Sequence, residues 1–319
     1  MQQLSPRLSL ITVVLFAIYV FLYPASVILV ALDRVPAWGI WMGGGFLIVQ
    51  GTLMGLWLSI NFSRWGAVSS AIILFLAWLV EHIGATTGFP FGIYTYTDVL
   101  QPKILGVVPM AIPFAWLLTV GAAVGTSEHV LEPTGRSVLD DMQVSVTKVL
   151  TAASLALLLD VTIEPFAVNI NHYWVWSDSG HSSYYGIPTT NFTAWWFTSV
   201  ILVLVLLSHR RAAALARRRY PARSVARTFW PWLPMTLYLT NLIMFVLVNL
   251  ARGQDLAAEI GALILLFLGW RLRLLPRMVR RLRKAQPQRA AHIAPVAVPL
   301  APDHLPEGVE GRVDAQAPA

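Results

Sequence analysis

The stretch LSLITVVLFAIYVFLYPASVILVAL, residues 8–32, decides the fold class, because it contains no charged residue along its whole length. As a helix it is long enough to cross the ~30 Å hydrocarbon core of a bilayer. It is longer than the roughly 7–15 residues of a signal-peptide core, and no A-x-A cleavage pattern follows it. The sequence therefore predicts a membrane-spanning helix that is not a signal peptide.

Similar apolar runs recur along the chain, which is 56% hydrophobic and only 12% charged. Soluble domains carry about twice that share of charged residues. The ~10-residue alternation of a membrane β-barrel is missing from the sequence. We therefore expect an all-α polytopic helical bundle of about eight transmembrane helices, although the short last run leaves seven possible. The expected spans are 8–32, 38–60, 65–83, 104–125, 146–168, 192–208, 229–250 and 256–270.

Positive charge predicts the orientation of this bundle. With eight spans and a cytoplasmic N-terminus, 20 of the 23 Lys and Arg residues lie on the cytoplasmic side. Cytoplasmic loops of membrane proteins carry such an excess. We therefore expect both termini inside, in a multi-pass protein of the inner (cytoplasmic) cell membrane. The charges flank apolar spans, which argues for topology signals and against a nucleic-acid partner.

Composition divides the chain into three segments. Residues 1–270 are expected to form the transmembrane domain. Residues 271–284 (RLRLLPRMVRRLRK) are basic with interleaved apolar residues, which predicts a surface segment on anionic lipids. Residues 285–319 are rich in Pro and Ala and lack Phe, Trp and Tyr, so we expect disorder there.

Two loops, residues 84–103 and 169–191, carry Gly, Pro, Tyr and Trp instead of simple charge. The predicted orientation places both on the outer face. One interpretation is a lid over the helix ends, and the other is an aromatic belt at the membrane interface that needs no function.

A weak internal sequence repeat includes these loops. Glu81 precedes Trp116 by 35 residues, and Asp160 precedes Trp195 by the same interval. Each interval also contains a Gly-hydrophobic-Pro segment, GVVP at 106–109 and GIP at 186–188. A duplicated helical hairpin would explain the match, and so would chance.

Four acids fall within or at the edge of the predicted spans, all toward the outer side. They are Glu81, Asp160, Glu164 and Glu259. Ionisable residues inside a bilayer are costly and usually functional. Asp160 and Glu164 are spaced i, i+4, which puts both on one helix face. Two such carboxyls in a low-dielectric pocket do not both ionise cheaply, so we expect a protonated acid beside a carboxylate base. The alternative is a structural site in which the acids bind backbone or Asn groups.

No metal or redox cofactor is expected from the sequence. Glu81, His82, Asp160, Glu164 and His172 offer metal-ligand groups, but no HxxxH or HxxE spacing occurs among these five residues. The chain has no cysteine, which excludes thiolate sites and disulfides. Phosphate-loop and Rossmann fingerprints are also missing. Polar residues of the seventh span, such as Tyr238 and Asn241, are more typical of hydrogen bonds between helices.

Several strings resemble the CruF-type carotenoid 1,2-hydratases, a membrane family that includes the bisanhydrobacterioruberin hydratases. They are EHIGATTGFPFGIYTYTDVL (81–100), GVVPMAIPFAW (106–116), LDVTIEPFA (159–167), WVW (174–176) and YYGIPTTNFTAW (184–195). The resemblance covers roughly residues 75–200 by motif. It implies addition of water across the terminal 1,2 double bond of an acyclic (ψ) carotenoid end without a cofactor. A carotenoid in the bilayer and water would then be the substrates.

The acids suit that chemistry. Hydration of a trisubstituted alkene needs a strong general acid, stabilisation of a tertiary cation, and a positioned water with a base. We expect Asp160 to donate the proton and Glu164 or Glu81 to activate water. Aromatic faces stabilise cations. The expected substrate-binding residues are His82, Tyr94, Tyr96, Trp116, Trp174, Trp176, Tyr184, Tyr185, Asn191 and Trp195.

Two other classes of function remain open from the sequence. A transporter would also carry intramembrane acids and broken loops, although its acids usually lie nearer the bilayer midplane. A non-catalytic carotenoid- or lipid-binding protein would bind pigment without changing it. Within the hydratase interpretation, the sequence does not choose between lycopene, γ-carotene and longer C50 substrates.

Overall fold

The computed structural model describes residues 4–131, 146–177, 184–219 and 230–272, and this part contains eight α-helices. Their bounds are α1 Leu4–Ala31, α2 Met42–Phe62, α3 Arg64–Thr87, α4 Ala111–Leu131, α5 Val146–Pro165, α6 Thr189–Arg219, α7 Leu233–Ala251 and α8 Asp255–Arg271. Seven helical segments are long and apolar enough to cross a membrane, and α8 is shorter at 17 residues. The predicted all-α, multi-pass membrane fold is confirmed.

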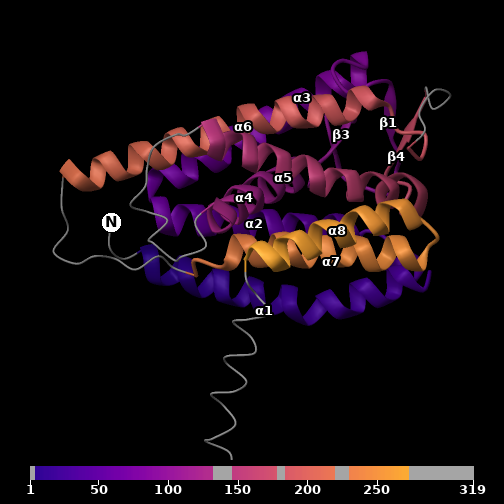
Figure 1. Cartoon of the computed structure of the whole chain (residues 1–319), viewed down its shortest axis with the longest axis horizontal. Coiled ribbons are helices and arrows are strands. Elements are labelled where there is room, and N and C mark those ends of the chain that lie inside the picture. The colour runs from indigo at the N-terminus through magenta and orange to yellow at the C-terminus, as the bar shows by residue number, and fades with distance from the viewer. Residues whose placement is uncertain (1–3, 132–145, 178–183, 220–229, 273–319) are drawn as a thin grey trace, which may run out of the picture. The chain divides into compact units, whose positions relative to one another are not determined.

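The helices lie side by side with nearly parallel axes (Figure 1). The connections α3–α4, α5–α6 and α7–α8 gather at one end of the helices, and α1 begins at the opposite end. The two aromatic loops therefore share one end of the bundle, as the span order requires. That this end faces outward remains a prediction from the charge distribution. The predicted segments 271–284 and 285–319 lie almost entirely outside the described residues.

The start predicted for the fourth span, at residue 104, is wrong. Strands β2 (Lys103–Ile104) and β3 (Val108–Pro109) form a small antiparallel hairpin, and α4 begins only at Ala111. The apolar run GVVP counted toward a helix by hydropathy, but the chain turns within it. Leu105 and Gly106, between the two strands, have φ of 51° and 71°, which a helix does not allow.

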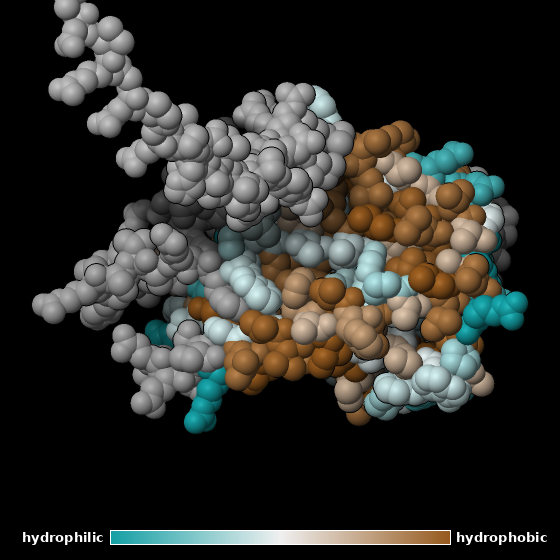
Figure 2. Space-filling model, turned by 90° about the horizontal axis from the view of Figure 1, so that it is seen from below, coloured by the Kyte–Doolittle hydropathy of each residue, from teal (hydrophilic) through white to brown (hydrophobic). Residues whose placement is uncertain are grey.

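The outer surface and the interior of the bundle differ as a membrane protein requires. Large apolar side chains such as Phe21, Leu263 and Trp270 are mostly exposed, and apolar residues cover much of the face shown in Figure 2. Inside, polar side chains join helices: Tyr238 donates to the Leu155 carbonyl (2.8 Å), and Asn241 donates to Gln50 (2.6 Å). The predicted hydrogen bonds from the seventh span to other helices are confirmed.

A buried ion pair joins α4 to α6 at the end of the bundle away from the aromatic loops. Arg210 lies 2.6 Å from Glu128, and both side chains are about nine-tenths buried. The Arg210 guanidinium also lies 4.7 Å from the centre of the Phe62 ring, at the end of α2. The pair thus holds three helices together.

Removal of one member of this pair is expected to destabilise the protein strongly. Glu128→Gln leaves the Arg210 charge buried without its partner, a change that typically costs about 3–5 kcal/mol. Unfolding in mixed micelles measures it. The double variant Glu128→Gln/Arg210→Met removes both charges and should be closer to wild type than the single variant. Equal stability of Glu128→Gln and wild type would contradict the account.

Candidate active site

The two aromatic loops pair with each other through short strands, β1 (Tyr94–Tyr96) and β4 (Trp174–Trp176). The strands are antiparallel, with Tyr94 opposite Trp176, Thr95 opposite Val175, and Tyr96 opposite Trp174. Side chains alternate across a strand, so the central Thr95 and Val175 are exposed while the four rings are buried. The loops therefore form a cover with an aromatic inner face, rather than a belt of separate residues.

Glu81, near the end of α3, lies beneath this cover and is 5% exposed. Its Oε2 accepts hydrogen bonds from the hydroxyls of Tyr94 (2.5 Å) and Tyr96 (2.7 Å). Its Oε1 accepts one from Nε1 of Trp116 on α4 (2.7 Å). Three donors from a strand and a neighbouring helix thus hold one carboxylate, and charge-assisted bonds of this kind are among the strongest in proteins.

The two tyrosines remain donors across the physiological pH range. Burial, and then the nearby Glu81 carboxylate, raises the pKa of Tyr94 well above its usual value. The same two causes raise the pKa of Tyr96. A hydroxyl that stays protonated keeps its hydrogen for Glu81.

Glu164 on α5 is held in the same manner by the other half of the cover. Its Oε2 accepts hydrogen bonds from Nε1 of Trp174 (3.2 Å) and Trp176 (3.3 Å). Its Oε1 accepts one from Nδ2 of Asn191 on α6 (2.8 Å). Glu164 thus makes the contact with an Asn group that the structural alternative expects.

Asp160 differs from both glutamates. It lies one turn before Glu164 on α5 and has 0% exposure. Neither of its carboxyl oxygens has a hydrogen-bond partner among the described residues. An unpaired buried charge is far more costly than a neutral carboxyl, and a buried polar group without a partner is rare. Among the described residues, Asp160 is therefore a buried carboxyl group without a hydrogen bond, one helix turn from the fully bonded Glu164.

The wall around these acids is aromatic. Trp116 and Trp195 stack, with ring centroids 3.8 Å apart and planes 17° apart. Pro165 has no N–H to donate to the carbonyl of Val161, and the Tyr184 hydroxyl donates to that carbonyl instead (2.7 Å). This bond holds the Tyr184 side chain against α5 at Val161, the residue that follows Asp160.

Three expected residues lie at the edge of the cluster or outside it. Glu259 is exposed on α8, so it does not belong to the buried group formed by the other three acids. The Tyr185 hydroxyl accepts a hydrogen bond from the backbone of Ala257 and so faces α8 (3.2 Å). His82 packs near Trp78, with ring centroids 5.5 Å apart, and its Nδ1 has no hydrogen-bond partner in the described part of the chain.

Metal-ligand groups do not converge in this site. Across residues 4–131, 146–177, 184–219 and 230–272, no three His, Cys, Asp or Glu side chains are placed to hold a metal ion. His172 is exposed, and its Nδ1 lies 2.9 Å from the Val168 carbonyl.

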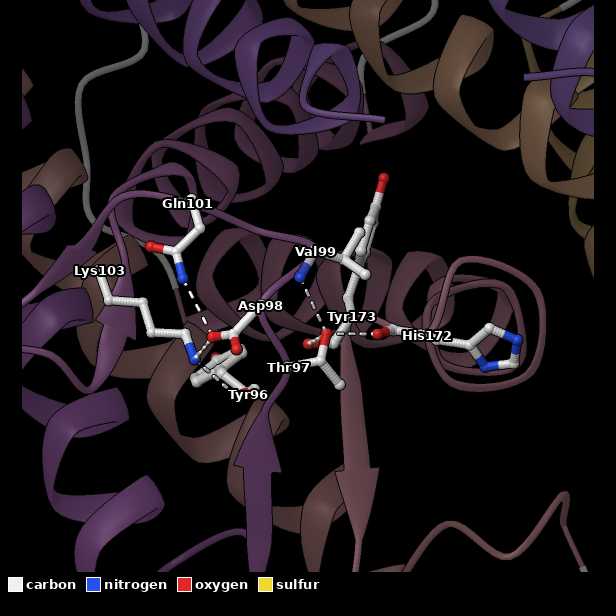
Figure 3. Close-up of polar contacts among 8 residues, drawn as sticks. All are labelled: Tyr96, Thr97, Asp98, Val99, Gln101, Lys103, His172 and Tyr173. Carbon is white, nitrogen blue, oxygen red and sulfur yellow. Dashed lines mark hydrogen bonds and ion pairs between the residues drawn. The ribbon is translucent and has the colours of Figure 1, made fainter. Parts of the chain in front are cut away.

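A group of polar contacts that the sequence did not indicate lies at the edge of the cover (Figure 3). We call this group, formed by Tyr96, Thr97, Asp98, Lys103 and His172, the polar latch. Lys103 donates to the Tyr96 carbonyl and to Asp98, both at 2.9 Å. Thr97 donates to the His172 carbonyl (2.6 Å), and the His172 ring points away from this cluster. These residues belong to both loops, so the latch fixes the strand that carries the Glu81 ligands. No spacing signal in the sequence marks these contacts.

Comparison with known proteins gives a consistent result. The family model described as "Carotenoid biosynthesis protein" matches residues 42–268. A bisanhydrobacterioruberin hydratase of Haloarcula japonica is 29% identical over 133 residues, which is 41% of each chain. The match thus spans about two fifths of that relative's length. No solved structure gives a significant match.

Proposed function

The chain belongs to the carotenoid biosynthesis protein family, and from this premise we propose that it is a carotenoid 1,2-hydratase, a hydro-lyase. It would add water across the terminal 1,2 double bond of an acyclic (ψ) carotenoid end and yield a tertiary alcohol. The observation that carries the proposal is the free, buried Asp160 carboxyl beside two hydrogen-bonded glutamates. The similarity to a named hydratase supports the reaction class.

The reaction begins with proton transfer. The protonated Asp160 carboxyl gives its proton to C2 as the double-bond electrons form the new C–H bond, which leaves a tertiary cation at C1. A water oxygen then bonds to C1 and loses a proton. Glu164 or Glu81 accepts this proton and returns it to Asp160, so the net change is the addition of one water.

Both glutamates have an unused acceptor position for such a water. A carboxylate offers about four lone-pair positions, and each glutamate uses three of them on protein donors. In each, two bonds fall on Oε2 and one on Oε1, which leaves one position on Oε1. A water bound there is held at the carboxylate that removes its proton.

Aromatic rings around the carboxyl groups offer an environment that would stabilise the tertiary cation at C1. Aromatic faces attract cations, most strongly when water is excluded. The Trp116–Trp195 stack and the inner rings of β1 and β4 are almost fully buried around the carboxyl groups. The two carboxylates add negative charge. The proposed hydration therefore needs no redox cofactor or metal.

The proposed setting rests on the fold and on the distribution of charge in the sequence. The carotenoid would lie in the bilayer of the inner (cytoplasmic) membrane, with its reacting end beneath the cover of β1 and β4. Water would reach the site from the outer side. Anionic lipids would bind the basic residues 271–284.

Expression of the protein in lycopene-producing and γ-carotene-producing strains tests the proposal. We expect pigments heavier by one water for each reacted ψ end, and a tertiary hydroxyl in the product. Lycopene, γ-carotene and a C50 precursor compared in parallel would identify the substrate. Unchanged pigments would contradict the proposal: pigment that co-purifies unchanged would indicate a binding protein, and altered pigment distribution a transporter.

A further inference from the structure

The two halves of the candidate site repeat each other in their contacts. In each half a glutamate near the end of a helix accepts two hydrogen bonds on Oε2 from the following strand. In each, Oε1 accepts one bond from the first turns of the next helix, from Trp116 or Asn191. The strand donors are at positions 94 and 96 in one half and 174 and 176 in the other, a constant offset of 80 residues.

The backbone repeats with the same offset. Leu105 and Gly106 have φ of 51° and 71°, and Tyr185 and Gly186 have φ of 53° and 75°. Positive φ at a bulky residue is uncommon. Two such pairs, 80 residues apart and each shortly before a helix of the site, are independent evidence for a duplicated helix–strand–helix unit.

Contacts between the halves fit a twofold axis. An antiparallel strand pair is symmetric about its central residues, here Thr95 and Val175. Trp116 stacks on Trp195, and these are the sixth residue of α4 and the seventh of α6. Helices α3 and α5 each pack against both α4 and α6. The axis would run from the strand pair toward the tryptophan stack.

This symmetry changes which acid of the second half corresponds to Glu81. The 35-residue intervals in the sequence paired Glu81 with Asp160, but the hydrogen bonds pair Glu81 with Glu164. One turn before Glu81, the counterpart of Asp160 is then Ala77. Both side chains have 0% exposure. Asp160 is thus the one carboxyl group of the site that the other half lacks.

We propose that Glu81 and Glu164 are equivalent halves of one carboxylate frame, and that Asp160 is the single acid that breaks its symmetry. The frame would work with this acid at position 160 or at the equivalent position 77. This inference rests on the proposed hydration for its activity readout. The glutamates would share the roles of holding water, accepting its proton and balancing the cation, so that neither is the sole base. A carboxyl at position 77 would meet the same frame from the other side of the axis.

Transplantation of the acid tests this inference. Asp160→Ala should lower hydration at least about 100-fold, the lower range for loss of a general acid. The double variant Ala77→Asp/Asp160→Ala should hydrate at least about tenfold faster than Asp160→Ala. The matched control Ala77→Asn/Asp160→Ala should be no faster than Asp160→Ala. A folded Ala77→Asp/Asp160→Ala protein without recovery would overturn the proposal.

Two further readouts keep the test decisive. The infrared C=O band of a protonated carboxyl should be present in wild type, lost in Asp160→Ala and regained in the transplanted variant, with or without substrate.

If the transplanted variant does not accumulate, the single variants Glu81→Gln and Glu164→Gln test the frame instead. The frame predicts that each substitution lowers hydration, and wild-type hydration by either variant would contradict it. Absence of hydration by wild type would refute the proposed function alone, because the infrared band tests the frame separately.

Discussion

Asp160→Asn is expected to abolish hydration without unfolding the protein. An amide has nearly the same shape but cannot protonate an alkene, and a general acid contributes typically about 10²–10⁴-fold to a rate. Because the Asp160 carboxyl accepts no hydrogen bond from the described residues, the substitution breaks no observed contact. Pigment profiles from a carotenoid-producing host, at equal protein level in the membrane, measure the loss.

Glu259→Gln is the matched control for this variant. It makes the same carboxyl-to-amide change at a helix position that is exposed and outside the site. Wild-type hydration is expected for Glu259→Gln. Wild-type hydration by Asp160→Asn would remove Asp160 from the reaction and leave the free buried carboxyl without a chemical role.

Trp116→Ala is expected to cause the largest loss of stability among single substitutions in the site. Trp116 is 1% exposed, stacks on Trp195 and donates to Glu81. Truncation of a buried large aromatic side chain typically costs about 3–5 kcal/mol. It also removes one of the three donors that hold Glu81, so hydration should fall together with the free energy of unfolding.

Two comparisons separate the causes. Trp116→Phe keeps an aromatic ring against Trp195 but removes the N–H donor, so it should retain more stability than Trp116→Ala and still lose activity. Trp270→Ala removes the same side chain from a position that is 73% exposed on α8, and it should be nearly neutral. Equal unfolding free energies for Trp116→Ala and Trp270→Ala would contradict the packing described.

The sequence predicted the helices well because each span carries its own local signal. A run of apolar residues such as 8–32 needs no partner to be recognised. The i, i+4 spacing of Asp160 and Glu164 also predicted, correctly, that both lie on the buried side of one helix. These features depend only on neighbours along the chain.

Long-range pairing was the part that the sequence did not reveal. The ligands of Glu81 and Glu164 are fixed by pairing between β1 and β4, whose residues are about 80 positions apart. Hydropathy also read the β2–β3 hairpin as part of a span, since two buried strand residues and a helix turn look alike in composition. The exposure of Glu259 depends on which face of α8 packs inward, and the all-round apolar composition of that helix does not indicate it.

Isotope labelling, with purified protein in liposomes that contain a ψ-ended carotenoid, tests the proposed hydration most directly. The reaction is run in D2O whose oxygen is a heavy isotope, with no added cofactor. We expect a tertiary alcohol with one deuterium at C2 and the heavy oxygen at C1, formed by wild type and not by Asp160→Asn. An unlabelled product, label at other carbons, or no conversion until a redox cofactor is supplied would contradict it.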